Sequence, residues 1–203
     1  MDPDGQSWFF NSETGDFFYH LEDDDDKIYM ITKEQYDKGT ESDDLKSYLQ
    51  TVKGDDNLFG YIFDTYDADI VIANVVQFFY DYANVSEEGN FDVLYRPGAI
   101  IKVIDNIEES STDYLFAVNS KNPNEVNINK YYPHFRGYDI MSYLAHEIKH
   151  QIDLNNGVKY KTNYHREIAA DDFAIQHWAY KKAYSAPKEI QKHRNYFLSK
   201  IKQ

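Results

Sequence analysis

Apolar residues recur at helical intervals in several parts of the chain. Within the range Ala68 to Ala83, the side chains of Val71, Val75 and Phe79 follow one another four residues apart, which is the spacing of a helix that packs against a core. Comparable patterns predict four further helical ranges: Lys33 to Val52, Ile140 to Asn155, His165 to Tyr184 and Lys188 to Lys200. Helices are therefore expected on both sides of a central segment with a different pattern.

Short runs of aromatic and β-branched residues between turn residues are typical of β-strands. The runs Ser7 to Phe10 and Asp16 to Tyr19 flank a turn-rich loop and predict a β-hairpin. A small sheet is predicted from four later runs: Phe91 to Tyr95, Ala99 to Ile104, Tyr114 to Val118 and Glu125 to Asn129. Because grouped strands precede grouped helices, the expected fold class is α+β. The expected division is a hairpin appendage over residues 1–32 and one domain over residues 33–203.

The composition excludes several classes of protein. The 203 residues include 19 Tyr and 13 Phe, enough large side chains to build a core. A nucleic-acid partner is not expected, because 35 Asp and Glu against 21 Lys and Arg leave a net charge of −14 that phosphates would repel. The lack of Cys excludes disulfides, thiolate nucleophiles and metal sites with sulfur ligands. No apolar run is long enough to span a membrane, and the first residues lack the features of a signal peptide.

The run from Glu22 to Lys27 consists of consecutive acidic residues followed by the lysine. It lacks the alternating oxygen ligands and the turn glycine of an EF-hand calcium loop. A solvated loop is therefore expected at this position.

The most informative residues form an HExxH sequence, His146-Glu147-Ile148-Lys149-His150, inside a predicted helix. Two histidines four residues apart lie one turn apart on the same helix face, with about 5–6 Å between their Cβ atoms. Both imidazoles can then reach one Zn²⁺ ion. Glu147 lies on an adjoining part of the helix surface, where its carboxylate is placed to act as the general base that takes a proton from an attacking water.

A catalytic zinc ion has three protein ligands and leaves one position open, so a third ligand is needed. Glu167 is the best candidate, because it starts a second predicted helix after the turn Asn155-Asn156-Gly157 and the reversal can bring the two helices side by side. Asp171 lies four residues further on the same face, where it could accept the outer N–H of His146 and fix the tautomer of that ring. His165 is a candidate for the group that stabilises the oxyanion, with a helix-cap role as the alternative.

Two other classes of HExxH enzyme do not fit the chain. The metzincin pattern requires Gly and His three and six residues after the second histidine, but those positions hold Asp153 and Asn156. The run from Ala145 to His150 is similar to the HExxH segment of peptide deformylases. Those enzymes use a cysteine as the third ligand, and this chain has none.

The chain resembles the gluzincins, a family of zinc peptidases in which HExxH is followed by a glutamate ligand in an ExxxD helix. The residues that carry the pattern are His146, Glu147, His150, Glu167 and Asp171. The run from Glu167 to Ala174 is similar to the small peptidases of the ImmA/IrrE kind, and the resemblance covers roughly Glu125 to Tyr184. It departs from that family in the short interval between His150 and Glu167 and in the lack of an accompanying DNA-binding domain.

This resemblance implies a zincin-like domain, in which a small twisted sheet packs on the HExxH helix and on the following helix with the glutamate ligand. It implies zinc-dependent hydrolysis of a peptide bond in a protein or peptide substrate. Residues Asp2-Pro3-Asp4-Gly5 are similar to the segment that ends the repeat core of Rhs-type polymorphic toxins, although Pro-Asp-Gly is also a good turn. That second resemblance implies a toxin domain delivered as part of a larger protein, with a cognate immunity protein as partner.

Two other functions remain open from the residues alone. The first is a zincin-like binding module with a structural metal site, in which a further protein ligand fills the fourth position. The histidines available for that position are His20, His134, His177 and His193. The second is a regulatory or self-processing peptidase.

Overall fold

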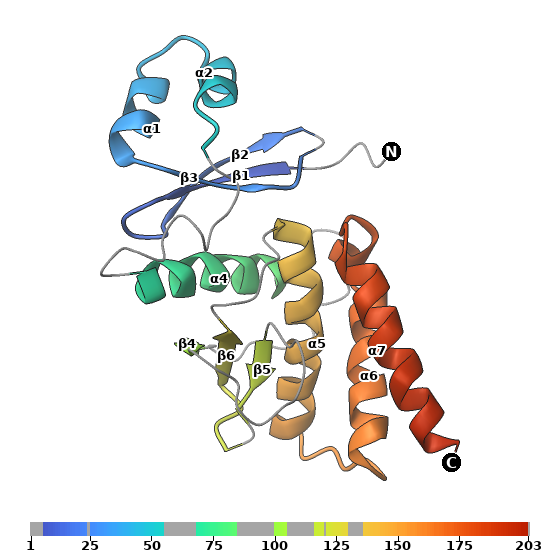
Figure 1. The fold of residues 1–203 in the computed structure, drawn as a ribbon. Helices are drawn as coiled ribbons and strands as arrows, with labels where there is room; N and C mark the ends of the chain where they lie inside the picture. Colours follow the sequence, from blue (N-terminus) through green and yellow to red (C-terminus); the bar gives the residue numbers. More distant parts are fainter. Residues whose placement is uncertain are drawn as a thin grey trace.

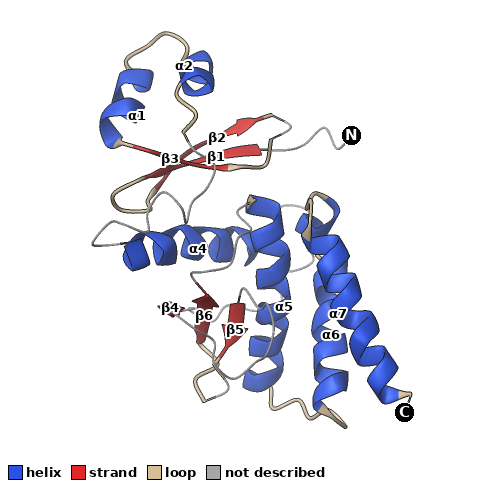
Figure 2. Ribbon diagram, in the orientation of Figure 1, coloured by secondary structure: helices blue, strands red, loops and turns tan. Residues whose placement is uncertain are grey.

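The computed structural model describes residues 6–23, 25–54, 68–84, 100–104, 116–119, 121–129 and 136–202. These residues form an α+β fold with six α-helices and two small mixed sheets, which confirms the expected class. Figure 1 shows the first sheet and two short helices at one end of the molecule, with helix α4 below them. The second sheet and three long helices lie on the other side of α4, and Figure 2 shows the same view by secondary structure.

The first sheet has the strand order β2-β1-β3, in which β1 is antiparallel to β2 and parallel to β3. Its strands are β1 Gln6–Asn11, β2 Phe17–Glu22 and β3 Ile28–Ile31. The predicted hairpin is confirmed, with Trp8 opposite His20 and Phe9 opposite Tyr19. Strand β3 was not predicted, because four consecutive apolar residues show neither a helical nor a strand period.

The acidic loop between β2 and β3 is not simply solvated, which corrects the expectation for Glu22 to Lys27. The side chain of Asp26 is buried and accepts hydrogen bonds from Trp8 Nε1 and from the backbone N–H of Tyr138, each at 3.1 Å. Burial raises the pKa of Asp26 to about 8, although the two hydrogen bonds oppose that shift. Asp26 thus accepts a hydrogen bond from a backbone N–H in the first turn of a distant helix.

The predicted helix from Lys33 to Val52 is present as two short helices, α1 Lys33–Thr40 and α2 Leu45–Thr51. The division occurs because Asp44 starts a new helix by accepting a hydrogen bond from the backbone N–H of Ser47. Gly39 near the end of α1 then lies against Tyr48 of α2, so closely that a Cβ atom would come within 2.6 Å of the tyrosine ring. The two helices cover one face of the first sheet, where Leu49 packs with β-strand side chains.

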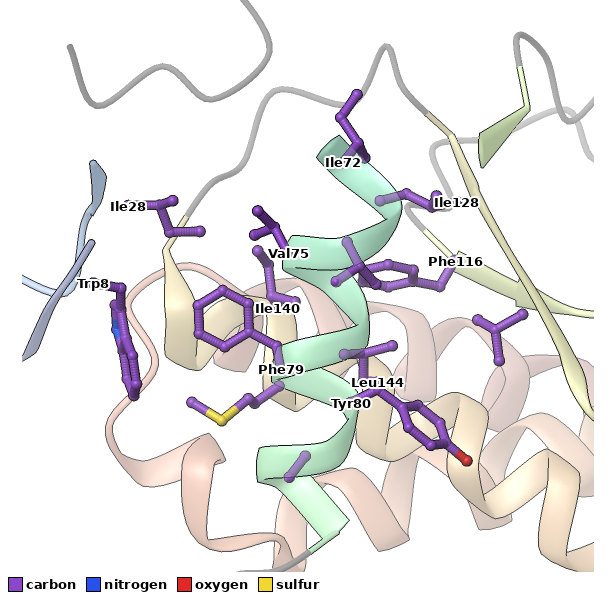
Figure 3. Close-up of a cluster of buried hydrophobic side chains, with 14 of the residues drawn as sticks. Trp8, Ile28, Ile72, Val75, Phe79, Tyr80, Phe116, Ile128, Ile140 and Leu144 are labelled. Atoms are coloured by element: carbon purple, nitrogen blue, oxygen red, sulfur yellow. The ribbon is translucent and has the colours of Figure 1, made fainter. Parts of the chain in front are cut away.

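Helix α4, Ala68–Asn84, lies at the centre of the main hydrophobic core and matches its predicted range. Figure 3 shows Trp8 and Ile28 on one side of α4 and Phe116 and Ile128 on the other. Fully burying side chains of this size stabilises a fold by about 1.5–3 kcal/mol each. The residues predicted as a hairpin appendage therefore contribute to the same core as the second sheet.

The second sheet has the order β4-β6-β5, with β4 parallel and β5 antiparallel to β6. Its strands are β4 Ile100–Ile104, β5 Phe116–Val118 and β6 Glu125–Asn129. All three lie within their predicted ranges, whereas the range Phe91 to Tyr95 lies outside the described residues. Strand β5 is at one edge of these three strands and packs against the HExxH helix.

Three long helices and a 3-10 turn complete the described fold, and none of the described helices has the length and apolar character needed to cross a membrane. They are α5 Gly137–Asn155, α6 Asn163–Gln176, η1 Trp178–Lys181 and α7 Ala186–Ile201. The helix predicted from His165 to Tyr184 is therefore too long. It ends because His177 adopts an extended backbone conformation, and its ring Nδ1 accepts a hydrogen bond from the backbone N–H of Ala179.

Candidate metal centre

Helix α5 carries the HExxH residues and is buried along most of its length. One side, including Leu144 and Ile148, belongs to the main core. Gln151 fixes the helix from within, since its Oε1 accepts a hydrogen bond from Tyr80 of α4 and its Nε2 donates to the carbonyl of Pro123 before β6. These contacts hold the face that carries His146 and His150 in a defined position relative to both neighbours.

The side chains of His146, His150 and Glu167 meet at one point between α5 and α6. The His146 and His150 Nε2 atoms are 3.0 Å apart, and Glu167 Oε2 lies 3.4 Å from the first and 3.2 Å from the second. Ligands of a tetrahedral zinc ion at about 2.0–2.1 Å lie about 3.3–3.4 Å apart, because the edge of a tetrahedron is about 1.6 times its centre-to-corner distance. The three donor atoms therefore form a group that could hold a metal ion.

The two oxygens of Glu167 have different neighbours. Oε2 faces the two histidines, whereas Oε1 accepts hydrogen bonds from Arg166 Nη2 at 2.9 Å and Arg166 Nε at 3.2 Å. Burial opposes ionisation of this carboxyl, but hydrogen bonds with His146 and His150 outweigh it and hold the pKa of Glu167 well below its usual range. Glu167 is thus an ionised carboxylate that presents one oxygen to the donor group, as a metal ligand requires.

Asp171 lies one turn beyond Glu167 on α6 and is almost completely buried. Its Oδ1 is 2.9 Å from His146 Nδ1. Burial would lower the pKa of His146, but the hydrogen bonds with Asp171 and Glu167 raise it to about 10. The metal-free ring therefore carries a proton on both nitrogens at neutral pH. A metal ion would displace the proton on Nε2, while Asp171 holds the proton on Nδ1 and so keeps Nε2 directed at the ion.

The side chain of Glu147 is directed toward the second sheet, and His146 and His150 are directed toward α6. It is 5 % exposed, and its Oε2 accepts a hydrogen bond from the backbone N–H of Val118 in β5 at 2.9 Å. Burial raises the pKa of the Glu147 carboxyl, against the opposing effect of His146 and His150. A raised pKa makes a carboxylate a stronger proton acceptor, which suits a general base.

His165 lies apart from this group. It is in the first turn of α6, where its Nδ1 lies 2.8 Å from Thr162 Oγ1 and its backbone N–H donates to the same hydroxyl. Glu167 is two positions further along the chain, about 200° around a helix, so the two side chains leave opposite faces. No contact of His165 with the donor group occurs among the described residues, and its role as an oxyanion donor stays a prediction.

The other histidines considered for a fourth ligand position have other neighbours where they are described. His177 is buried between Ala83 and Ala179, and burial lowers its pKa to about 4. His20 in β2 packs beside the Trp8 ring, and His134 lies outside the described residues. Within the described ranges, the donor group therefore consists of two imidazoles and one carboxylate.

From the sequence, His193 is only one of the four histidines available for a fourth ligand position, and its contact with Asp171 is not predicted. Its Nδ1 lies 2.9 Å from Asp171 Oδ2, so α7 reaches the carboxylate that also holds His146. The only local signal is that His193 follows the apolar Ile190 by three residues, on the face that packs inward. That signal identifies a buried helix face and says nothing of Asp171, which is 22 residues away.

Comparison of the chain with protein-family models, with curated proteins and with solved structures gives no match.

Proposed function

We propose that this chain is a zinc-dependent peptidase of the gluzincin type. The observation that carries the proposal is the triangle of His146 Nε2, His150 Nε2 and Glu167 Oε2, whose sides of 3.0, 3.2 and 3.4 Å are within a few tenths of an ångström of the ligand spacing of a tetrahedral zinc ion. The donor chemistry supports the same ion, because imidazole and carboxylate without sulfur are the ligands of many catalytic zinc sites. Three protein donors are also the number that leaves a position for water or substrate.

The chain's own residues would divide the work of hydrolysis as follows. His146, His150 and Glu167 hold the ion, which when bound supplies a Lewis acid that polarises the carbonyl and lowers the pKa of water. Glu147 would accept a proton from the water as the water oxygen forms a bond to the carbonyl carbon, and would return that proton to the leaving amine as the C–N bond breaks. Asp171 keeps the His146 ring in the tautomer that presents Nε2.

A second function is favoured by one specific observation. Glu147 is buried and held by the backbone N–H of Val118, which is also how a carboxylate with a purely structural role would be satisfied. A metal-binding module without hydrolytic activity would have the same three ligands and the same Glu147 contact. The two functions differ in whether substitution of Glu147 changes a measurable reaction.

The delivery of this domain as a toxin, and the immunity protein that such a toxin would need, rest on residues 2–5, which lie outside the described residues. They are proposed here only as the setting in which a peptidase of this kind would act. A growth arrest that depends on Glu147 when the chain is expressed in a target cell would support this setting, and unchanged growth would oppose it.

The test of the peptidase proposal begins with metal content. Purified protein should contain one zinc ion per chain, and His146→Ala and Glu167→Ala should lose it. Hydrolysis is then followed with fluorescein-labelled casein and with a mixed peptide library whose products are identified by mass spectrometry.

The decisive variant is Glu147→Gln, which should retain zinc and lose hydrolysis by a factor of about 10² or more. The matched control is Asp153→Asn, a buried acid on the same helix that contacts Lys149 and Tyr160 instead of the donor group. The control should retain both properties. Zinc without any hydrolysis in the unaltered chain would favour the binding module, and full activity of Glu147→Gln would refute the assigned base.

A further inference from the structure

We propose that His193 is a positioning residue of the metal centre, which acts on His146 through Asp171. This inference rests on the proposed metal site but not on the peptidase reaction. It is carried by the position of one buried carboxylate between two imidazoles that belong to different helices.

Asp171 uses both of its oxygens. Oδ1 lies 2.9 Å from His146 Nδ1, and His193 Nδ1 lies 2.9 Å from Oδ2 and 3.1 Å from Oδ1. An ionised carboxylate can only accept, so both rings present an N–H to it. Two donors restrict the rotation of the carboxylate more than one donor would, and this restricts the orientation of the His146 ring.

The rings themselves are packed together. The centroids of His146 and His193 are 5.6 Å apart at a steep angle, and the ring of His193 also makes an edge-to-face contact with Phe197 at a centroid distance of 4.6 Å. Asp171 is 1 % exposed, so the bridging carboxylate is shielded from water. Hydrogen bonds to a buried charge are stronger than the same bonds in solvent.

Helix α7 is held so that His193 reaches this position. Its first residues are fixed by Asp139 of α5, which accepts hydrogen bonds from the backbone N–H groups of Ser185 and Ala186, each at 2.8 Å. Ala186, Ile190 and His193 are spaced by four and three residues and share one face. Ala186 and Ile190 are buried against small side chains of α5 and α6, which permit close approach of the helices: Ala145 and Ala174. The face that carries His193 is therefore fixed by packing as well as by hydrogen bonding.

A second metal site made of His146 Nδ1, Asp171 and His193 is the competing explanation for the same residues, since their donor atoms also lie close together. The geometry favours the hydrogen-bonded chain. His146 Nδ1 lies 2.9 Å from Asp171 Oδ1, and His193 Nδ1 lies 2.9 Å from Oδ2 and 3.1 Å from Oδ1, all ordinary hydrogen-bond distances. His146, His150 and Glu167 instead converge through one atom each. A second ion would also need the Nδ1 lone pair of His146, and the ring would then bridge two ions.

The proposal predicts a specific pattern of zinc affinities. Removal of an outer-shell partner typically weakens metal binding by 10–100-fold, so His193→Ala should weaken zinc binding by about 10-fold. His193→Asn should recover most of the affinity, because its amide N–H lies close to the position of the imidazole Nδ1–H. His193→Gln places its amide near the Nε2 position and should not recover it.

The matched control is Arg194→Ala. Arg194 Nε donates to Asp172 Oδ1, so this neighbouring contact also joins α7 to α6 but does not touch Asp171. If α7 acts only as a packing element, Arg194→Ala and His193→Ala should weaken zinc binding alike. If His193 acts through Asp171, only the second variant should do so.

The experiment measures zinc affinity of the metal-free full chain by competition with a chromophoric chelator, and the visible spectrum of the Co²⁺-loaded protein as a report of ligand geometry. The same measurements are made on Asp171→Ala and on the double variant with His193→Ala. We expect the Co²⁺ spectrum to change in His193→Ala but not in Arg194→Ala, and the double variant to bind zinc no more weakly than Asp171→Ala alone.

Several results would overturn the proposal: equal losses in His193→Ala and Arg194→Ala, additive losses in the double variant, or two zinc ions per chain of which one depends on His193. Where His193→Ala does not fold by circular dichroism, the comparison of His193→Asn with His193→Gln decides, and equal affinities there refute it. Zinc binding without hydrolysis removes the peptidase function and leaves this inference intact. A chain that binds no zinc refutes both.

Discussion

The carboxylate of Asp139 accepts hydrogen bonds from both the backbone N–H and the hydroxyl of Ser185, at 2.8 and 2.7 Å. Asp139 is in the first turn of α5, and Ser185 is the residue before α7. Ser185 makes no cap with its own side chain, so the helix that carries the candidate metal ligands supplies the cap of α7 from 46 residues away. This contact connects the start of the HExxH helix to the position of His193.

We expect Asp139→Ala to lower the free energy of unfolding by about 2–3 kcal/mol, because it leaves the part-buried backbone donor of Ser185 and the buried backbone donor of Ala186 without this acceptor. Urea denaturation followed by far-UV circular dichroism measures the change. The control is Glu189→Ala, which removes a partly buried acid from the first turn of α7. We expect this variant to change the free energy of unfolding by no more than about 0.5 kcal/mol. Equal losses in the two variants would contradict the proposed cap.

Zinc should stabilise the folded chain if the donor group binds it. A ligand present at 100 to 1,000 times its dissociation constant stabilises the folded state by about 3–4 kcal/mol, which for a chain of this size corresponds to roughly 5–15 °C in Tm. Differential scanning calorimetry with and without zinc measures this shift after treatment with a chelator.

The shift should disappear in His150→Ala and Glu167→Ala, because each removes one corner of the donor triangle. It should persist in Asp153→Asn, whose carboxylate contacts Lys149 and Tyr160. A zinc-dependent shift that survives in both ligand variants would place the binding site elsewhere on the chain.

His177 should make the stability depend on pH in a mildly acidic range. Burial lowers the pKa of His177 in the folded protein to about 4, below its ordinary value of 6.5. Between these values the unfolded chain binds a proton that the folded protein does not, so stability rises with pH. The contribution is fully present above pH 6.5, and about 3 kcal/mol of it is lost as the pH falls to 4.

The measurement is the difference in unfolding free energy between the wild type and His177→Gln, taken from pH 7 to pH 4 in the presence of a chelator. The unfolding free energy of the wild type should fall toward that of the variant as the pH falls. The reason is that the unfolded chain gains a proton on His177, whereas the folded protein keeps the ring neutral in its hydrogen bonds with Ala83 and Ala179. His20→Asn, in the first sheet, is the control for nonspecific loss of an imidazole. A difference that stays constant over this range would show that His177 is not held neutral.

The local elements followed closely from the order of residues. The four-residue spacing of apolar side chains predicted α4 and most of α5, because residues four apart face the same neighbour in any helix. The predicted helix that began at His165 was too long, because the side chain of His177 caps a new turn and its backbone leaves the helical region. The end of a helix that is caused by the hydrogen bond of one side chain leaves no sign in the periodic pattern of apolar residues.

The residues of the donor group could be predicted from the same kind of spacing. His146 and His150 are one turn apart by their spacing, and so are Glu167 and Asp171 on the following helix. The turn between α5 and α6 made it reasonable to expect the two pairs side by side, and the structure brings them together at distances of 2.9 to 3.4 Å. Short connections between helices limit their relative arrangement, which is why this part of the site could be anticipated.

The remaining contacts were decided only by how distant segments pack. Asp26 reaches the start of α5 from a loop more than a hundred residues earlier, and His193 reaches Asp171 because α7 is anchored at its first turn. Spacing along one helix determines which side chains share a face, since the backbone geometry repeats. Which distant donor meets a buried carboxylate depends instead on the sum of many packing contacts, and no short stretch of residues contains that information.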